Sequence, residues 1–371
     1  MSAEFIGDNL RLIRLFHGLS LTELGERVNV SKQYLSRLEA GEPMTAQLES
    51  ALVDELKVLP EFFYAVEPEP IADDQCHFRS QLTTKPALRQ IGRARGEMLK
   101  RLVRVLDNHL DLPAYQIGAA DASTIENIER GAEEFRKRFG LGLGPLSNIT
   151  RTAENAGAVV TMVDGLAPEI DAVSFATKRP VIALNAGGRS ACRQRFGIAH
   201  ELGHFALHHG VLTGDRLTET QANRFASALL LPRSSFGADC RHAVRGSRLN
   251  WKGISELKKK WGTSKAAIIF RGHQLGHLNE AQVRTGFIFL RRHGEAIEEV
   301  EDRFIAHESP SVLVDGLMVM REQLNLPMAY VAREMKVQVS LLYKLSPRLQ
   351  QPMEELQRPN VVSIFRSRQT A

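Results

Sequence analysis

One helical stretch constrains this chain more than any other part of it. Residues 196–208 read Phe-Gly-Ile-Ala-His-Glu-Leu-Gly-His-Phe-Ala-Leu-His. On an α-helix, residues four apart lie on one face, so His200 and His204 can direct ring nitrogens at the same point. Two converging imidazoles are typical of a zinc site that keeps a position open for water. Glu201 is adjacent and is predicted to be the base that takes the proton of that water as it attacks a carbonyl.

A second segment supplies the remainder of such a site. Residues 219–232 read Glu-Thr-Gln-Ala-Asn-Arg-Phe-Ala-Ser-Ala-Leu-Leu-Leu-Pro. Zinc hydrolases need a third protein ligand, often a carboxylate from a later helix, and Glu219 fits that role. Asn223 lies one turn further on the same face, where it can accept a hydrogen bond from the other nitrogen of a ligating histidine. Further along the same helix, an apolar stripe is expected to dock it on the first one, and its members are Phe225, Ala226, Leu229 and Leu230.

Other residues near these motifs have less definite interpretations. His208 and His209 are further possible ligands, but histidines near a helix end are more often partly solvated. Asp215 is interpreted as a turn residue between the two helices. No side chain is assigned as the oxyanion stabiliser. A buried His-Glu-x-x-His helix without a metal is the alternative interpretation of the whole pattern.

These motifs resemble the ImmA/IrrE metallopeptidase family. The resemblance is carried by His-Glu-Leu-Gly-His, by Glu-x-x-Ala-Asn-x-Phe-Ala and by Leu-Leu-x-Pro, and it extends from about residue 126 to 275. It implies a zinc metalloendopeptidase with a gluzincin-like site. His200, His204 and Glu219 would then bind Zn2+, and Glu201 would be the catalytic base.

Composition restricts the compartment and the class of protein. The chain has 371 residues, which predicts two or three domains, and three widely spaced cysteines, which make no disulfide framework. This cysteine usage favours a reducing cytoplasm. The N-terminus has no signal-peptide pattern, and no apolar run is long enough to cross a membrane. A net charge of +5 is compatible with nucleic-acid binding but does not establish it.

The first 66 residues predict a five-helix bundle that contains a helix-turn-helix. Residues 9–16 form an amphipathic pattern that ends at Gly18. Ser20 begins a capping box for a short second helix, and Asn29 suits the left-handed turn that follows. Ser31 then caps a third helix over residues 32–39. Two short helices joined by a tight turn are the helix-turn-helix arrangement.

This segment resembles the XRE (Cro-like) family of DNA-binding domains. The matching residues are Leu19-Ser20, Leu24, Val30-Ser31, Tyr34 to Glu39, and Gly41. The resemblance implies that the third helix enters the major groove of double-stranded DNA. Lys32, Gln33 and Ser36 are then expected at base edges. Ser31, Tyr34 and Arg37 are expected closer to phosphates. A helix-turn-helix that binds protein is the alternative, and a homodimer on paired half-sites is expected.

The other regions are predicted from changes in periodicity. Residues 67–113 are expected to be a linker with a basic helix over 86–109, whose cations either follow DNA phosphates or form a solvated face. Residues 114–280 predict the peptidase-like domain, with helices at 123–140 and 146–156 and strands at 157–163, 172–176 and 180–185. Its last two strands can form a hairpin, which either offers an edge to an extended substrate or only covers the core. Residues 281–371 predict a helical region, in which 326–345 echo 19–38 and suggest packing helices or additional contacts. The expected fold class is α+β, mostly helical.

Three functional hypotheses follow. The first is a DNA-binding transcriptional regulator whose zinc peptidase cuts a regulatory protein, either an XRE-type repressor or the chain itself. The second is a DNA-binding regulator with a catalytically silent or sensory zinc site. An intact Glu201 disfavours it, since a purely structural site has no use for a base. The third is a toxin–antitoxin component, because proteins with this pairing of domains resemble those of toxin–antitoxin and phage-related loci.

Overall fold

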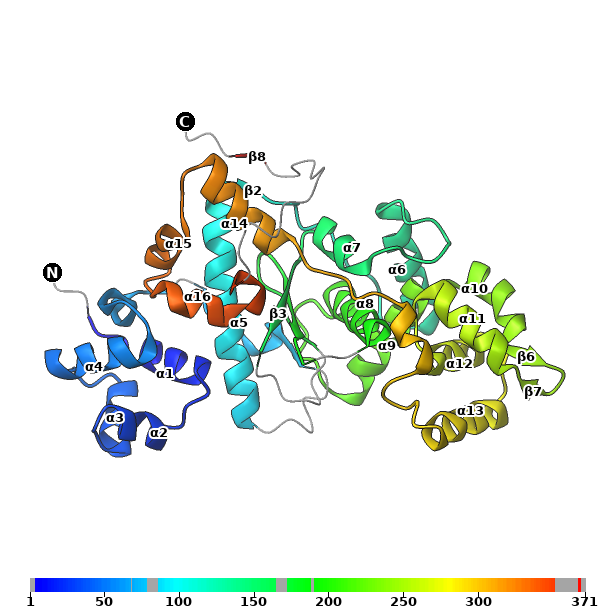
Figure 1. Ribbon diagram of the computed structural model, residues 1–371, viewed down its shortest axis with the longest axis horizontal. Helices are drawn as coiled ribbons and strands as arrows, with labels where there is room; N and C mark the ends of the chain where they lie inside the picture. The colour runs from blue at the N-terminus through cyan, green and yellow to red at the C-terminus, as the bar shows by residue number, and fades with distance from the viewer. Residues whose placement is uncertain are drawn as a thin grey trace.

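The computed structural model describes residues 4–67, 69–78, 86–164, 172–187 and 190–350, together with the backbone of Arg366–Ser367 (Figure 1). Within these residues the chain forms sixteen α-helices and a small mixed sheet of four strands. The predicted α+β, mostly helical class is therefore confirmed. The predicted C-terminal region ends at residue 371. Its residues 351–365 and 368–371 lie outside the described residues.

The N-terminal bundle contains four α-helices and one 3-10 helix, and these confirm the five predicted helices. Their bounds are α1 Gly7–Phe16, α2 Leu21–Arg27, α3 Lys32–Glu39, α4 Ala46–Leu56 and η1 Pro60–Tyr64. Ser20 and Glu23 form the predicted capping box, and Ser31 accepts a hydrogen bond from the Tyr34 amide at the start of α3. Asn29 has φ +56°, which is the left-handed conformation that the turn requires.

One long helix and the C-terminal helices share their core with this bundle. The long helix is α5 Pro86–His109, and the C-terminal ones are α14 Val312–Gln323, α15 Met328–Glu334 and α16 Val339–Leu345. Figure 1 shows α15 and α16 between α5 and the bundle. The Gln338 amide donates to the Lys57 carbonyl at 2.9 Å, so the first turn of α16 adjoins the end of α4. The C-terminal echo of the helix-turn-helix thus serves to pack the bundle on α5.

The sheet lies between α5 and the helix that carries the two histidines. Its strands are β1 Cys76–Phe78, β3 Val159–Val163, β4 Ala172–Phe175 and β5 Val181–Asn185, in the order β1-β4-β5-β3. β4 and β5 form the predicted hairpin, whereas β3 and β5 are parallel. Val173 and Phe175 belong to the core around α5, and Ala172 belongs to the second core. This alternation is the period-two pattern of a strand that is buried on both faces.

The second core is built around α8 and is mostly helical. Its helices are α6 Ile125–Arg138, α7 Ile149–Asn155, α8 Ala191–Leu207, α9 Arg216–Leu230, α10 Arg233–Cys240, α11 Trp251–Trp261, α12 Lys265–Gln274 and α13 Glu280–Arg292. Short elements complete the chain: η2 Asp73–Gln75, η3 Arg241–Ala243, η4 Val300–Phe304, η5 Pro347–Gln350, β2 Leu110–Asp111 paired with β8 Arg366–Ser367, and β6 Val244–Arg245 paired with β7 Arg248–Leu249. No helix in the described part of the chain is long and apolar enough to span a bilayer.

The basic residues of α5 mostly face carboxylates. Lys100, Arg101 and Arg104 all lie within 3.2 Å of the Glu67 carboxylate, and Arg93 pairs with Asp73 at 2.5 Å. Glu67 is only 10% exposed, so its contacts anchor the segment that leaves the bundle, whereas the Arg93–Asp73 pair is solvent-exposed. Cations that already contact carboxylates in this way are less available to bind phosphates.

Candidate metal centre and nucleic-acid interface

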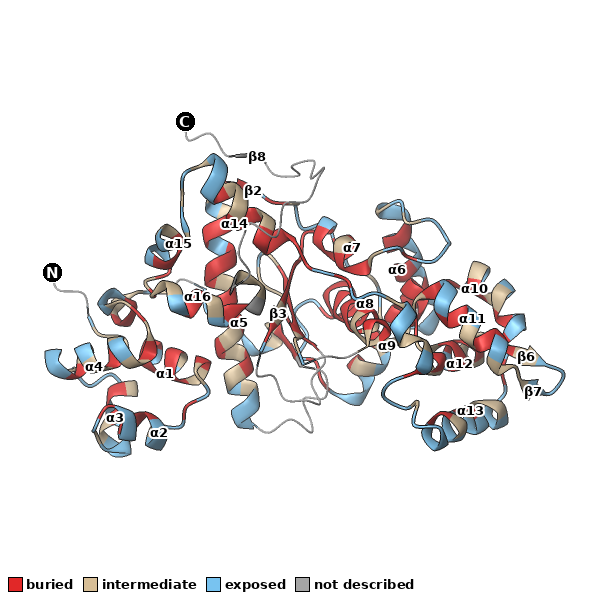
Figure 2. Cartoon of the chain, in the orientation of Figure 1, coloured by how far each residue is buried: buried red, intermediate tan, exposed pale blue. Residues whose placement is uncertain are grey.

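Two packed helices carry the side chains of the candidate metal centre. Asp215 begins α9 as its N-cap, since its carboxylate accepts a hydrogen bond from the Thr218 amide at 2.7 Å. A Cβ added at Gly203 of α8 would lie 3.1 Å from the Ala222 carbonyl oxygen, so the absence of a side chain lets α8 and α9 approach closely. Figure 2 shows that α8 is buried along most of its length.

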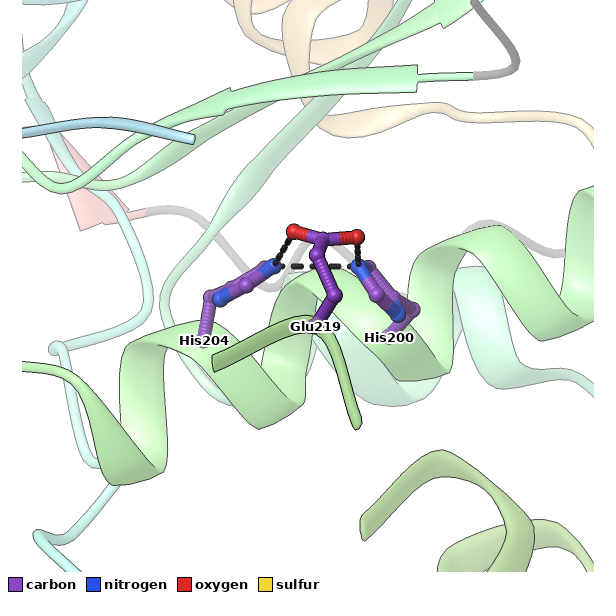
Figure 3. Close-up of side chains that lie close together, drawn as sticks. All are labelled: His200, His204 and Glu219. Carbon is purple, nitrogen blue, oxygen red and sulfur yellow. Dashed lines mark hydrogen bonds and ion pairs between the residues drawn. The ribbon is translucent and has the colours of Figure 1, made fainter. Parts of the chain in front are cut away.

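His200, His204 and Glu219 converge on one point (Figure 3). The two Nε2 atoms are 3.0 Å apart. The Glu219 carboxylate spans them, with one oxygen 3.5 Å from Nε2 of His200 and the other 3.3 Å from Nε2 of His204. Both histidines are fully buried, and the carboxylate is 18% exposed. The three residues that the sequence proposed as metal ligands therefore lie together.

Asn223 determines which nitrogen of His200 carries the proton. Its Oδ1 lies 3.0 Å from Nδ1 of His200. A carbonyl oxygen only accepts, so Nδ1 must donate, and the Nε2 lone pair faces Glu219. The contact is the one that the sequence predicted for Asn223.

A second relay determines the tautomer of His204, and it begins at Gln221. The Gln221 amide nitrogen donates to the Ala122 carbonyl at 2.9 Å, which leaves its Oε1 to accept from Nε2 of His208 at 3.0 Å. Nδ1 of His208 then accepts from Nδ1 of His204 at 2.9 Å. His204 thus also presents a bare Nε2 to the centre.

His208 corrects one expectation from the sequence. It was expected to be partly solvated at the helix end, but it is buried, and it orients His204 from the side away from the centre. Burial lowers the pKa of His208, and burial together with the nearby His208 lowers the pKa of His204 to about 3. Both rings are therefore neutral at physiological pH, which is the form that binds a metal.

Glu201 is held by the sheet. Its Oε2 accepts a hydrogen bond from the hydroxyl of Ser174 on β4 at 2.5 Å, and the carboxylate is buried. The sequence placed Glu201 next to the histidines but gave no sign of Ser174, because the contact joins two elements that are 27 positions apart.

The candidate DNA-binding face is formed by α3. Ser31, Lys32, Gln33, Ser36 and Arg37 are exposed, whereas Tyr34 is half-buried. Figure 2 shows this helix at the outer side of the bundle. The Ser31 hydroxyl caps α3. Arg37 pairs with Glu42 at 3.0 Å and lies over the Tyr34 ring.

Two protein families match the segments that contain the candidate sites. The IrrE N-terminal-like domain of the M78 peptidases matches residues 153–273, and a helix-turn-helix domain of the XRE type matches residues 10–50. The chain carries an XRE-type helix-turn-helix domain and an IrrE/ImmA-like peptidase domain. The IrrE-like match includes α8 and α9, and the XRE-type match includes α2 and α3. A search of curated proteins found no match to the chain.

Proposed function

We propose that this chain is a DNA-binding regulator whose IrrE-like domain is a zinc metalloendopeptidase that cuts a regulatory protein. One observation supports the metal above all. Nε2 of His200, Nε2 of His204 and the Glu219 carboxylate converge, and the two relays place the proton of each neutral ring on Nδ1, away from the centre. Acceptor atoms that converge in a buried site repel one another, and a bound cation would be attracted to all of them.

The distances between these atoms suit zinc. Ligands that lie about 2.0–2.1 Å from a tetrahedral zinc are separated from one another by about 3.3 Å. The observed separations among His200, His204 and Glu219 are 3.0, 3.3 and 3.5 Å. Three protein ligands leave the fourth position open, which distinguishes a catalytic site from a structural one.

The chemistry that follows is peptide hydrolysis. When bound, zinc polarises a carbonyl and makes water a nucleophile at neutral pH. Glu201 would take the proton of the attacking water on its carboxylate and deliver it to the departing amine. The Ser174 hydroxyl holds one oxygen of that carboxylate and so orients the group. A base of this kind favours a peptidase over a silent zinc site.

The DNA-binding part of the proposal rests on the exposed face of α3. Lys32, Gln33 and Ser36 would meet base edges in the major groove, while Ser31, Tyr34 and Arg37 would contact phosphates. Binding at an operator would bring the peptidase to its substrate, either an XRE-type repressor or this chain itself. A homodimer on paired half-sites completes the proposal.

Glu201→Gln tests the peptidase. The variant keeps the shape of the side chain and its contact with Ser174 but cannot take a proton, so zinc content and DNA binding should persist while proteolysis stops. New protein N-termini would be compared in cells that express the wild type, Glu201→Gln or His200→Ala, the last of which should also lose zinc. The same set of N-termini in all three strains would refute the peptidase and favour a silent zinc site.

A further inference from the structure

No sequence pattern predicted that residues 76–78 form a strand next to the candidate active site. β1 extends the sheet beyond β4, and the two strands are antiparallel, with His77 opposite Ser174. The Ala176 amide also donates to the Gln75 carbonyl at 2.8 Å. In chain order β1 lies between the DNA-binding bundle and α5, whereas β4 follows α7. The segment that leaves the bundle therefore contributes β1 to the sheet.

β1 covers β4, the strand that lies beside the candidate base Glu201. Ser174 points to the α8 side of β4, where its hydroxyl donates to Glu201. The opposite edge of β4 is paired with β5. β1 therefore occupies the edge of β4 that would otherwise be open beside the candidate catalytic carboxylate.

His77 fills the space between this edge and the metal-binding helix. Its ring is stacked on His204, with centroids 4.9 Å apart and planes inclined by 8°. Nδ1 contacts the Thr213 hydroxyl at 2.7 Å. The side chain is 1% exposed, and its Nε2 has no hydrogen-bond partner among the described residues. A buried polar atom without a partner is costly and is not explained by packing alone.

We propose that Cys76–Phe78 occupies, within the same chain, the edge of β4 on which an extended peptide substrate pairs, and that cleavage requires β1 to leave. An open strand edge accepts an extended peptide through main-chain hydrogen bonds and admits alternate side chains to the site. β1 has this form: it is extended and antiparallel, and it directs one side chain toward the metal-binding helix. The proposal rests on the peptidase function proposed above.

The segment before β1 links it to the DNA-binding bundle. Ile71 is buried in the core that the bundle shares with α5, and its amide donates to Glu97 of α5 at 2.9 Å. Glu67, four residues earlier, is held by the cations of α5. A three-residue strand on such a tether can be exchanged for a substrate strand without unfolding either domain.

Replacement of His77 tests the proposal, because proline and alanine have different effects there. In an antiparallel ladder the hydrogen-bonded pairs alternate, so the contact between Ala176 and Gln75 places His77 in the next such pair. His77→Pro removes the ring and the ladder donor, whereas His77→Ala removes the ring alone. Zinc content is measured for both variants, and β-casein serves as an extended protein probe.

Hydrogen exchange gives a result that does not depend on catalysis. In Glu201→Gln protein that also carries His77→Pro, the β4 amides should exchange at least about tenfold faster than with His77→Ala, and excess β-casein should restore their protection. With Glu201 intact, His77→Pro should cleave β-casein faster than His77→Ala. Failure of casein to protect β4, or equal behaviour of the two variants, would overturn the proposal. Restored protection without cleavage by any zinc-loaded variant would support the strand exchange and refute the peptidase.

A cross-link tests the same idea without loosening the fold. Phe78 lies opposite Val173 in a pair without ladder hydrogen bonds, where Cα atoms are about 4.5 Å apart and a disulfide fits. Phe78→Cys with Val173→Cys should lose casein binding on oxidation and regain it with dithiothreitol. Val173→Cys alone is the control. Unchanged binding in the oxidised double variant would contradict the proposal.

Discussion

Asn223→Ala gives the most direct test of how the candidate metal centre is oriented. The amide oxygen of Asn223 lies 3.0 Å from Nδ1 of His200, and the His200 side chain is fully buried. Removing the acceptor leaves a buried N–H without a partner, which costs about 1–3 kcal/mol. Loss of a group that orients a ligating histidine typically weakens metal binding by about 10–100-fold, which is about 1.4–2.7 kcal/mol. The first value is a cost in folding stability, and the second is a loss of zinc affinity.

The assay is competition for zinc with a chromophoric chelator at a fixed pH, with the fold checked by thermal unfolding. Asn223→Asp is the matched variant, because a carboxylate also accepts from Nδ1 and should bind zinc at least as tightly as the wild type. Gln221→Ala removes the far end of the other relay, which reaches His204 only through His208. Its loss of affinity should be smaller, below about tenfold.

Two results would refute this reasoning. If Asn223→Ala binds zinc as tightly as the wild type, the hydrogen bond does not set the tautomer of His200. If Gln221→Ala loses more affinity than Asn223→Ala, the relay through His208 matters more than the direct contact.

Three further changes test the other parts of the molecule. Lys32→Ala with Gln33→Ala should abolish preference among DNA sequences in fluorescence anisotropy, at about 1–3 kcal/mol for each base contact, while zinc content stays unchanged; retained preference would contradict the assignment of α3. Burial raises the pKa of Glu154 to about 7. The folded state therefore keeps a proton that the unfolded state releases. The free energy of unfolding should fall as pH rises from about 4.5 to 7, by at most about 3 kcal/mol. Glu154→Gln should remove this pH dependence in urea titrations. A Cβ at Gly96 would lie 2.2 Å from the buried ring of Phe175 on β4, so Gly96→Ala should destabilise the protein by about 1–3 kcal/mol. Gly197→Ala is the control, because its Cβ would meet nothing within 4 Å. Equal unfolding midpoints of the two variants would show that the packing around Gly96 adjusts to the added methyl group.

Much of the fold was predictable because its signals are local. A capping box at Ser20, a left-handed residue at Asn29 and the four-residue spacing of His200 and His204 each depend on residues within one or two helical turns. The helix over residues 86–109 was predicted from its periodicity. The proposed domain boundaries at 66, 113 and 280 stay predictions, since the bundle, α5 and the C-terminal helices share one core.

The parts that the sequence did not reveal depend on contacts between distant residues. β1 is three residues long, too short for a strand pattern, and it exists because β4, almost a hundred positions later, provides its partner. His208 is buried because α9 covers the end of α8 and brings Gln221 to it. The cations of α5 are anchors because the chain leaving the bundle places Glu67 among them. The sequence by itself determined many of the helices, their caps and the residue types of the candidate metal centre, because these depend on local spacing. Only the tertiary structure decided how that centre is oriented and which segment covers it, because packing alone brings those residues together.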